Sequence, residues 1–187
     1  RILGEARDKE NLLFERLKFL SITASNLDEF FMVRVASLKD MIHADYTKKD
    51  IAGLSAKEQL ERINVVTHEM VEKQYSTYNR SLLPQLATNG LKVIAHHEDL
   101  DDEQKKFADH YFRENIYPVL TPMAVDSSRP FPLIRNKSLN IGAILKKKNE
   151  KKAEEEFATV QVPAVLPRII RLPDAKDGTK QVILLEQ

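Results

Sequence analysis

Three basic side chains beside a proline-rich stretch are the first candidates for chemistry in this sequence. Arg129, Arg135 and Lys137 fall within nine residues. An ordered but irregular loop could direct them at an anionic chain, and the Arg guanidinium suits bidentate contacts with phosphate oxygens. The alternative is a loop whose charges only meet water. Because 29 Lys and Arg nearly balance 28 Asp and Glu over the chain, any anion site must be local.

The five histidines give little indication of catalysis or metal binding. His96 and His97 are adjacent, so on a strand they would face opposite sides and form neither a chelate nor a catalytic pair. The sequence has no P-loop, no dinucleotide-binding glycine motif and no zinc-protease or nucleophile-elbow motif. With no Cys, it also lacks thiolate nucleophiles and disulfides. We therefore predict no catalytic residue and no metal site within this chain.

The composition predicts a globular protein without a nucleic-acid partner. The formal net charge is +1, so no overall positive field would attract nucleic acid. No apolar run approaches the roughly 18 residues that cross a bilayer, and the first residues lack the basic-then-apolar pattern of a signal peptide. We expect a cytoplasmic protein, with peripheral attachment to the membrane as the alternative. The chain starts without Met and ends in an apolar run, so we expect it to be a piece of a longer protein.

Residues up to about 86 carry the pattern of helices. Apolar side chains recur at spacings of three and four over residues 13–20 and again over 27–42, which predicts two amphipathic helices. Residues 23–29 between them are expected to turn, with Ser25 and Asp28, or Asn26 and Glu29, forming a capping box.

Two further signals bound a third, longer helix. Ser55 and Glu58 form a second capping signal at its start, and the helix should run for about 30 residues to the stop at Asn89-Gly90. The capping pair and the stop together predict one long helix that closes the helical part of the chain.

The pattern changes after Gly90. We expect a strand at 91–95, a helix at 101–116 and an irregular loop over the prolines between 118 and 132. Further strands are expected at 139–145 and 157–162, and a hairpin around Asp177-Gly178. The predicted fold class is α+β: an antiparallel helical bundle over residues 1–88, then an α+β domain over 89–187 that is incomplete at its C-terminal end.

Several segments of the sequence resemble one enzyme family. Residues 12–20 (LLFERLKFL) and 25–35 (SNLDEFFMVRV) look like the N-terminal domain of the long, multidomain bacterial polyphosphate kinases. Four segments resemble the head, or middle, domain of the same family: YPVLTPMAVD (117–126), RPFP (129–132), SLN (138–140) and VPAVLPR (162–168). The segments follow the family's order and cover most of the chain.

The resemblance implies an enzyme that reversibly moves the terminal phosphate of ATP onto polyphosphate through a phosphohistidine, with Mg²⁺. In the family, that histidine and the groups around the phosphates and Mg²⁺ lie in C-terminal domains that this chain does not include. We therefore expect the chain alone to be inactive, because phosphoryl transfer needs its positioning and charge-neutralising groups together. The resemblance also implies a homodimer of the full-length protein.

The resemblance assigns a role to one residue and a ligand to the basic loop. The family's Asn that reaches the adenine of ATP or ADP corresponds to Asn26, whose amide can both donate and accept hydrogen bonds. The alternative is an N-cap, and both roles are compatible if Ser25 caps while Asn26 points outward. The candidate polyphosphate contacts are Arg129, Arg135 and Lys137, although the family more commonly has His at the position of Arg129.

Two other interpretations remain open. The chain could serve chiefly as a structural module that makes subunit and domain contacts. It could also be a helical adaptor that binds a protein partner through an apolar surface, in which case Phe30, Phe31 and Met32 would be partly exposed.

Overall fold

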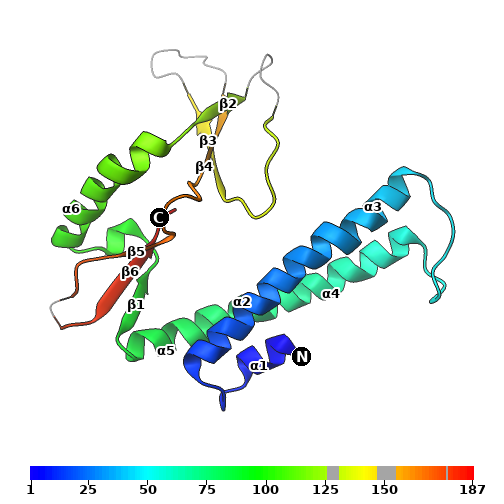
Figure 1. Ribbon diagram of the computed structural model, residues 1–187, viewed down its shortest axis with the longest axis horizontal. Coiled ribbons are helices and arrows are strands. Elements are labelled where there is room, and N and C mark those ends of the chain that lie inside the picture. Colours follow the sequence, from blue (N-terminus) through cyan, green and yellow to red (C-terminus); the bar gives the residue numbers. More distant parts are fainter. Residues whose placement is uncertain (126–130, 147–154, 176) are drawn as a thin grey trace. The chain divides into compact units, whose positions relative to one another are not determined.

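The computed structural model describes residues 1–125, 131–146, 155–175 and 177–187. The chain divides into two compact units, Arg1–Asn89 and Gly90–Gln187 (Figure 1). The first unit is helical and the second combines helices with two small sheets, which confirms the predicted α+β class. No helix in the described part of the chain is long and apolar enough to cross a membrane.

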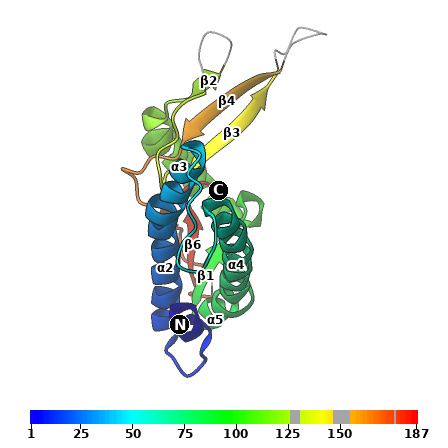
Figure 2. The same cartoon turned by 90° about the vertical axis from the view of Figure 1, so that its right-hand side faces the viewer.

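The first unit is built on a hairpin of two long helical segments. One segment comprises α2 (Leu13–Phe30), a π-helical turn (Phe31–Val35) and α3 (Ala36–His43). The other comprises α4 (Ala56–Thr77), a π-helical turn (Tyr78–Leu82) and α5 (Leu83–Thr88). The two segments are antiparallel because α3 contacts α4 while α2 contacts the later π-helical turn (Figure 2). The short helix α1 (Ile2–Arg7) packs against α2.

The predicted turn at residues 23–29 is wrong. These residues lie inside α2, and the helical path continues through the π-helical turn into α3. A capping box requires an extended residue at the N-cap, so neither Ser25 nor Asn26 caps a helix. No Gly or Pro interrupts residues 13–43, and the Thr23 hydroxyl donates to the Phe19 carbonyl, 2.9 Å away. Polar side chains within this stretch are therefore accommodated by the helix, so no break occurs.

The signals predicted for the second long segment are confirmed. The Ser55 hydroxyl accepts from the Glu58 N–H at 3.3 Å, and the Glu58 carboxylate accepts from the Ser55 N–H at 2.7 Å. At the other end Gly90 has a φ of 82°. This left-handed conformation suits a residue without a Cβ, and it ends the helical segment before the first strand.

The second unit contains two three-stranded sheets. The first has the order β1-β6-β5, with β1 (Leu91–Ile94) parallel to β6 (Lys180–Leu184) and β5 (Ile169–Arg171) antiparallel to β6. The second has the order β2-β4-β3 and is antiparallel throughout, with β2 (Met123–Val125), β3 (Asn140–Leu145) and β4 (Glu156–Gln161). Helix α6 (Asp102–Tyr111) follows β1 and continues into a π-helical turn, Phe112–Ile116.

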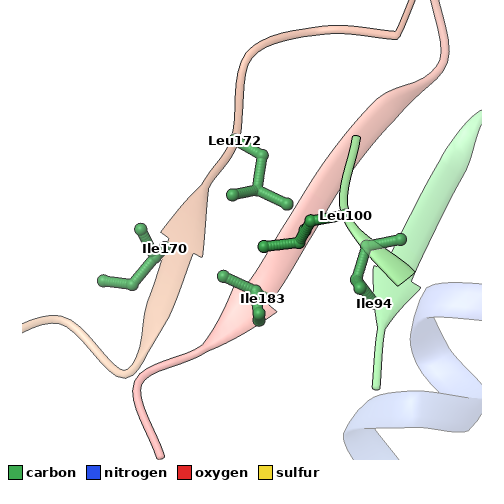
Figure 3. Packing of buried hydrophobic residues seen from close by; sticks show 5 residues of the cluster. All are labelled: Ile94, Leu100, Ile170, Leu172 and Ile183. Atoms are coloured by element: carbon green, nitrogen blue, oxygen red, sulfur yellow. The ribbon is translucent and has the colours of Figure 1, made fainter. Parts of the chain in front are cut away.

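The core of the second unit forms between the first sheet and α6. Its five buried side chains come from β1, β5, β6 and the segments beside them (Figure 3): Ile94, Leu100, Ile170, Leu172 and Ile183. Phe107, Ala108 and Tyr111 of α6 pack against this cluster. The core therefore joins strands that lie almost ninety residues apart in the sequence, since β1 and β6 are neighbours.

The strand predictions hold except in the proline-rich stretch. The predicted strands after Gly90 and in the C-terminal half correspond to β1, β3, β4, β5 and β6. Residues 118–132 were expected to form only an irregular loop, yet Met123–Val125 form β2 by pairing with β4. This strand has only three residues, too few to show an alternating pattern. It forms because β4, more than thirty residues later, supplies its hydrogen-bond partners, so it could not be predicted from its own sequence.

Candidate functional site

Asn26, the predicted adenine contact, lies on an exposed part of α2. Phe30 is four residues further along the same helix, and this spacing places both side chains on one face. Phe30 and Phe31 contact each other edge to face, with ring centroids 6.2 Å apart. The side chains of Phe30, Phe31, Met32 and Val33 are between 36% and 64% exposed. An amide with both hydrogen-bonding functions therefore stands one helical turn from an accessible aromatic ring.

The described part of the basic loop forms a tight turn before β3. The Ser138 N–H and hydroxyl both donate to the Arg135 carbonyl, at 3.2 Å and 2.6 Å. Lys137 has a φ of 59°, a left-handed conformation that is uncommon for a residue with a side chain. Arg135 and Lys137 are both exposed, so this turn presents two positive charges to solvent. Arg129, the third predicted contact, lies outside the described residues.

Arg135 and Lys137 line a hollow of about 350 Å³ together with residues of the segment after β4. That segment contributes Pro163, Leu166 and Arg168. The structure therefore brings Arg135 and Lys137 together with a third basic residue that the sequence analysis did not single out. Arg168 closes the VPAVLPR segment, and no local pattern links it to a loop thirty residues earlier.

The guanidinium of Arg168 is held by a carboxylate. Its Nη2 lies 2.6 Å from the Glu186 Oε1, and its Nε donates to the same oxygen at 3.2 Å. This hydrogen bonding lowers the pKa of Glu186 below the ordinary value for a Glu. Glu186 is therefore ionised at neutral pH and offsets one of the three positive charges of the hollow.

The histidines do not assemble a site within the described residues. His97 Nε2 lies 3.7 Å from the Asp109 Oδ1, and both side chains are well exposed. In the same part of the chain, no three His, Asp or Glu side chains gather into a set that could hold a metal ion. The described geometry thus offers an exposed amide one helical turn from an exposed aromatic ring in the first unit, and a basic hollow in the second.

Comparison with protein-family models identifies both parts of the chain. Residues 1–94 match the model of the polyphosphate kinase N-terminal domain, and residues 103–187 match that of the polyphosphate kinase middle domain. The chain belongs to the polyphosphate kinase family. A polyphosphate kinase of Lactiplantibacillus plantarum is 52% identical over 187 residues, which are all of this chain and 25% of that protein. One from Halalkalibacterium halodurans is 49% identical over the same length and is covered to 26%.

A solved structure supports the same assignment. The crystal structure of polyphosphate kinase from Porphyromonas gingivalis matches 99% of this chain with a TM-score of 0.83 and 28% sequence identity. The match covers 26% of that protein. The chain thus spans about a quarter of the length of its polyphosphate kinase relatives.

Proposed function

We propose that this chain forms the N-terminal and middle domains of an ATP:polyphosphate phosphotransferase. The observation that carries the proposal is the succession of the two family models, in order, across nearly the whole chain. In this proposal the full-length protein reversibly transfers the terminal phosphate of ATP to polyphosphate through a phosphohistidine that lies outside these residues. Mg²⁺ would likewise be bound by domains outside this chain.

The division of labour follows from the physics of phosphoryl transfer. Catalysis depends on neutralising charge around the moving phosphoryl group and on aligning the attacking and leaving oxygens. The described histidines are spread over both units and have no shared site, and four of them are exposed: His43, His68, His96 and His110. This distribution favours a supporting role for the chain and a reactive histidine elsewhere in the protein.

For the first unit, we propose that Asn26 contacts the adenine of ATP. Its amide can donate to a ring nitrogen and accept from the exocyclic amino group of adenine. Phe30, one turn away and accessible, offers a ring on which a purine could stack. The combination of an exposed amide and an exposed ring on one helix face supports this assignment beyond the resemblance of the SNLDEF segment.

For the second unit, we propose that Arg135 and Lys137 contact the polyphosphate chain, together with Arg129. The turn before β3 holds the first two beside a hollow. Arg can bind a phosphate with two parallel hydrogen bonds, whereas Lys acts as a point charge. The Glu186 carboxylate pairs with Arg168 and offsets its positive charge, so we assign the phosphate contacts to the loop residues and not to Arg168.

The adenine assignment is tested in the complete protein by Asn26→Ala. We expect the KM for ATP to rise several-fold with kcat little changed, because the lost contact binds the base and does not touch the reacting phosphate. Asn79→Ala is a matched control, since Asn79 is also exposed on a helical segment of the same unit. Unchanged nucleotide kinetics in Asn26→Ala would remove the assignment, and absence of any ATP-dependent polyphosphate synthesis by the complete protein would remove the proposed function.

A structural role for the first unit is favoured by its exposed apolar side chains. Phe31, Met32 and Val33 follow one another and are 43%, 53% and 64% exposed. Contiguous patches of exposed apolar side chains mark interaction surfaces. We propose that this surface contributes to a subunit interface of the homodimer. Sedimentation of the complete protein should show that Met32→Glu dissociates the dimer, and an unchanged dimer would place the interface elsewhere.

A further inference from the structure

A second basic hollow lies in the first unit, where the end of α1 and the start of α2 meet α4 and its π-helical turn. Its volume is about 470 Å³, within the range of ligand sites. Five of its lining residues are basic and one is acidic: Arg7, Lys9, Arg16, Lys73 and Arg80, against Glu72. The net formal charge of the lining is therefore +4 (five minus one), whereas the whole chain carries +1.

The charge at the floor of this hollow is buried. Arg16 is only 2% exposed. Its guanidinium donates to three neutral acceptors, the Ala6 carbonyl at 3.0 Å, the Ser81 hydroxyl at 2.9 Å and the Gln85 side-chain carbonyl at 3.3 Å. No carboxylate of the described chain lies within ion-pairing distance of it. A buried positive charge without a counterion is unfavourable, so an anion bound in the hollow would serve as the counterion of Arg16.

The same floor retains hydrogen-bond donors. A guanidinium carries five N–H groups, and three of those of Arg16 are used. The Ser81 hydroxyl accepts from both Arg16 and the Gln85 amide, the latter at 3.1 Å. Because both interactions use its oxygen, its hydrogen remains to be donated. Among the described residues, two N–H groups of Arg16 and the O–H of Ser81 therefore have no acceptor, and a phosphate oxygen could accept from them.

The rim of the hollow adds exposed positive charge. Arg7, Lys9 and Arg80 are exposed, and within the described chain none of them forms an ion pair. Lys73 has only a long contact to Glu69, at 3.8 Å between two exposed side chains. Such a surface pair is weak and is easily exchanged for a ligand. The lining therefore offers a buried cation at its floor and further cations around its opening.

We propose that this hollow, which is lined by residues of the first unit, binds a condensed phosphate chain. A net charge of +4 matches several phosphate groups in a row better than it matches one carboxylate or one orthophosphate. The choice of a phosphate chain over other polyanions rests on the proposed function, whereas the anion site itself rests on the charges and donors described above. The helical hairpin would then provide a polyphosphate contact in addition to the one proposed for the basic loop.

Binding of sodium tripolyphosphate and of a longer linear polyphosphate to the 187-residue chain tests the proposal by isothermal titration calorimetry. The variant Arg7→Gln with Arg80→Gln removes two exposed cations of the rim and leaves Arg16 and the fold in place. The control is Lys57→Gln with Arg62→Gln, which removes two exposed cations of α4 outside the hollow. Thermal unfolding followed by circular dichroism checks that both variants stay folded.

We expect the rim variant to bind both phosphate chains about tenfold more weakly, and the control to bind like the parent. Affinity should also fall as salt is raised, because the contacts are ionic. Equal affinity of rim variant and control would overturn the proposal. The proposal would also be overturned if the rim cations bound ATP or an RNA oligonucleotide while neither phosphate chain bound.

The outcome is separable from that of the proposed function. If the complete protein synthesises polyphosphate from ATP while the rim variant of this chain binds normally, only the second site is wrong. If the rim variant loses binding but the complete protein shows no phosphotransferase activity, the anion site stands and the proposed function fails.

Discussion

Arg16 should be the side chain on which the helical unit depends most among its polar groups. It joins α2, on which it lies, to three other parts of the unit: α1 through the Ala6 carbonyl, the π-helical turn through Ser81 and α5 through Gln85. The Ala6 carbonyl lies in the last turn of a six-residue helix, where carbonyls have no intrahelical partner. Replacing Arg16 by Leu would leave this carbonyl without its donor in a buried place.

The size of the effect follows from two opposing terms. Two of the three hydrogen bonds are short, 3.0 Å and 2.9 Å, and bonds from a charged donor contribute about 1.5–3 kcal/mol each. Removing the buried charge also relieves its desolvation, which offsets part of the loss. We expect Arg16→Leu to lower the free energy of unfolding by about 2–4 kcal/mol, a large share of the ~5–15 kcal/mol of an ordinary domain.

Urea unfolding followed by circular dichroism measures this loss, because the helical signal comes mainly from the first unit. A loss of about 3 kcal/mol with a slope of ~2 kcal/mol/M shifts the midpoint by roughly 1.5 M. Arg16→Lys keeps the charge but not the planar fork, so it should fall between the parent and Arg16→Leu. Lys18→Leu, on the exposed face of the same helix, should leave the midpoint unchanged. If Arg16→Leu lowers the free energy of unfolding by less than about 0.5 kcal/mol, the hydrogen bonds of Arg16 do not stabilise the unit as proposed.

Three smaller effects can be measured by urea unfolding, two of them as a function of pH. Ser55→Ala should lower the stability of the first unit by about 1 kcal/mol, because α4 loses its side-chain cap, and an unchanged midpoint would contradict this. The pKa of Glu58 is lowered, chiefly by the hydrogen bond from the Ser55 N–H. The ionised carboxylate therefore contributes to the stability of the first unit above the ordinary Glu pKa, and this contribution declines as pH falls through the lowered folded-state pKa. Glu58→Gln should reduce the loss of stability at acid pH, and an unchanged pH dependence would contradict this. Arg168 likewise lowers the pKa of Glu186, so Arg168→Met should reduce the loss of stability of the second unit at acid pH. An unaltered dependence of its unfolding free energy on pH would show that the Arg168–Glu186 pair does not cause that loss.

Most elements of the fold could be predicted from local patterns. The capping box at Ser55, the stop at Gly90 and the alternation over residues 139–145 each depend on side chains within a few positions of one another. The error at residues 23–29 arose because Ser, Asn and Asp favour helix starts and are also tolerated inside a helix. Packing of α2 on the second helical segment decided between these states.

The candidate site was only partly predictable. Asn26 and the basic loop were predicted from motifs and stay predictions, and they belong to separate units of the chain. Arg168 joins Arg135 and Lys137 only because the segment after β4 returns to the start of β3. The hollow around Arg16 was missed because its lining comes from residues 7–16 and 72–81, and no local spacing relates these two stretches.

The sequence by itself determined most of the helices and strands, though neither the continuous helix over residues 23–29 nor strand β2. It also carried the family assignment, because these features depend on patterns between neighbouring residues. Only the tertiary structure decided which charges share a surface. Burial of Arg16 among neutral acceptors, and the pairing of Arg168 with Glu186, depend on contacts between segments that are distant in the chain. A charge gains its energetic meaning from its solvent exposure and its partners, and these are properties of the folded arrangement.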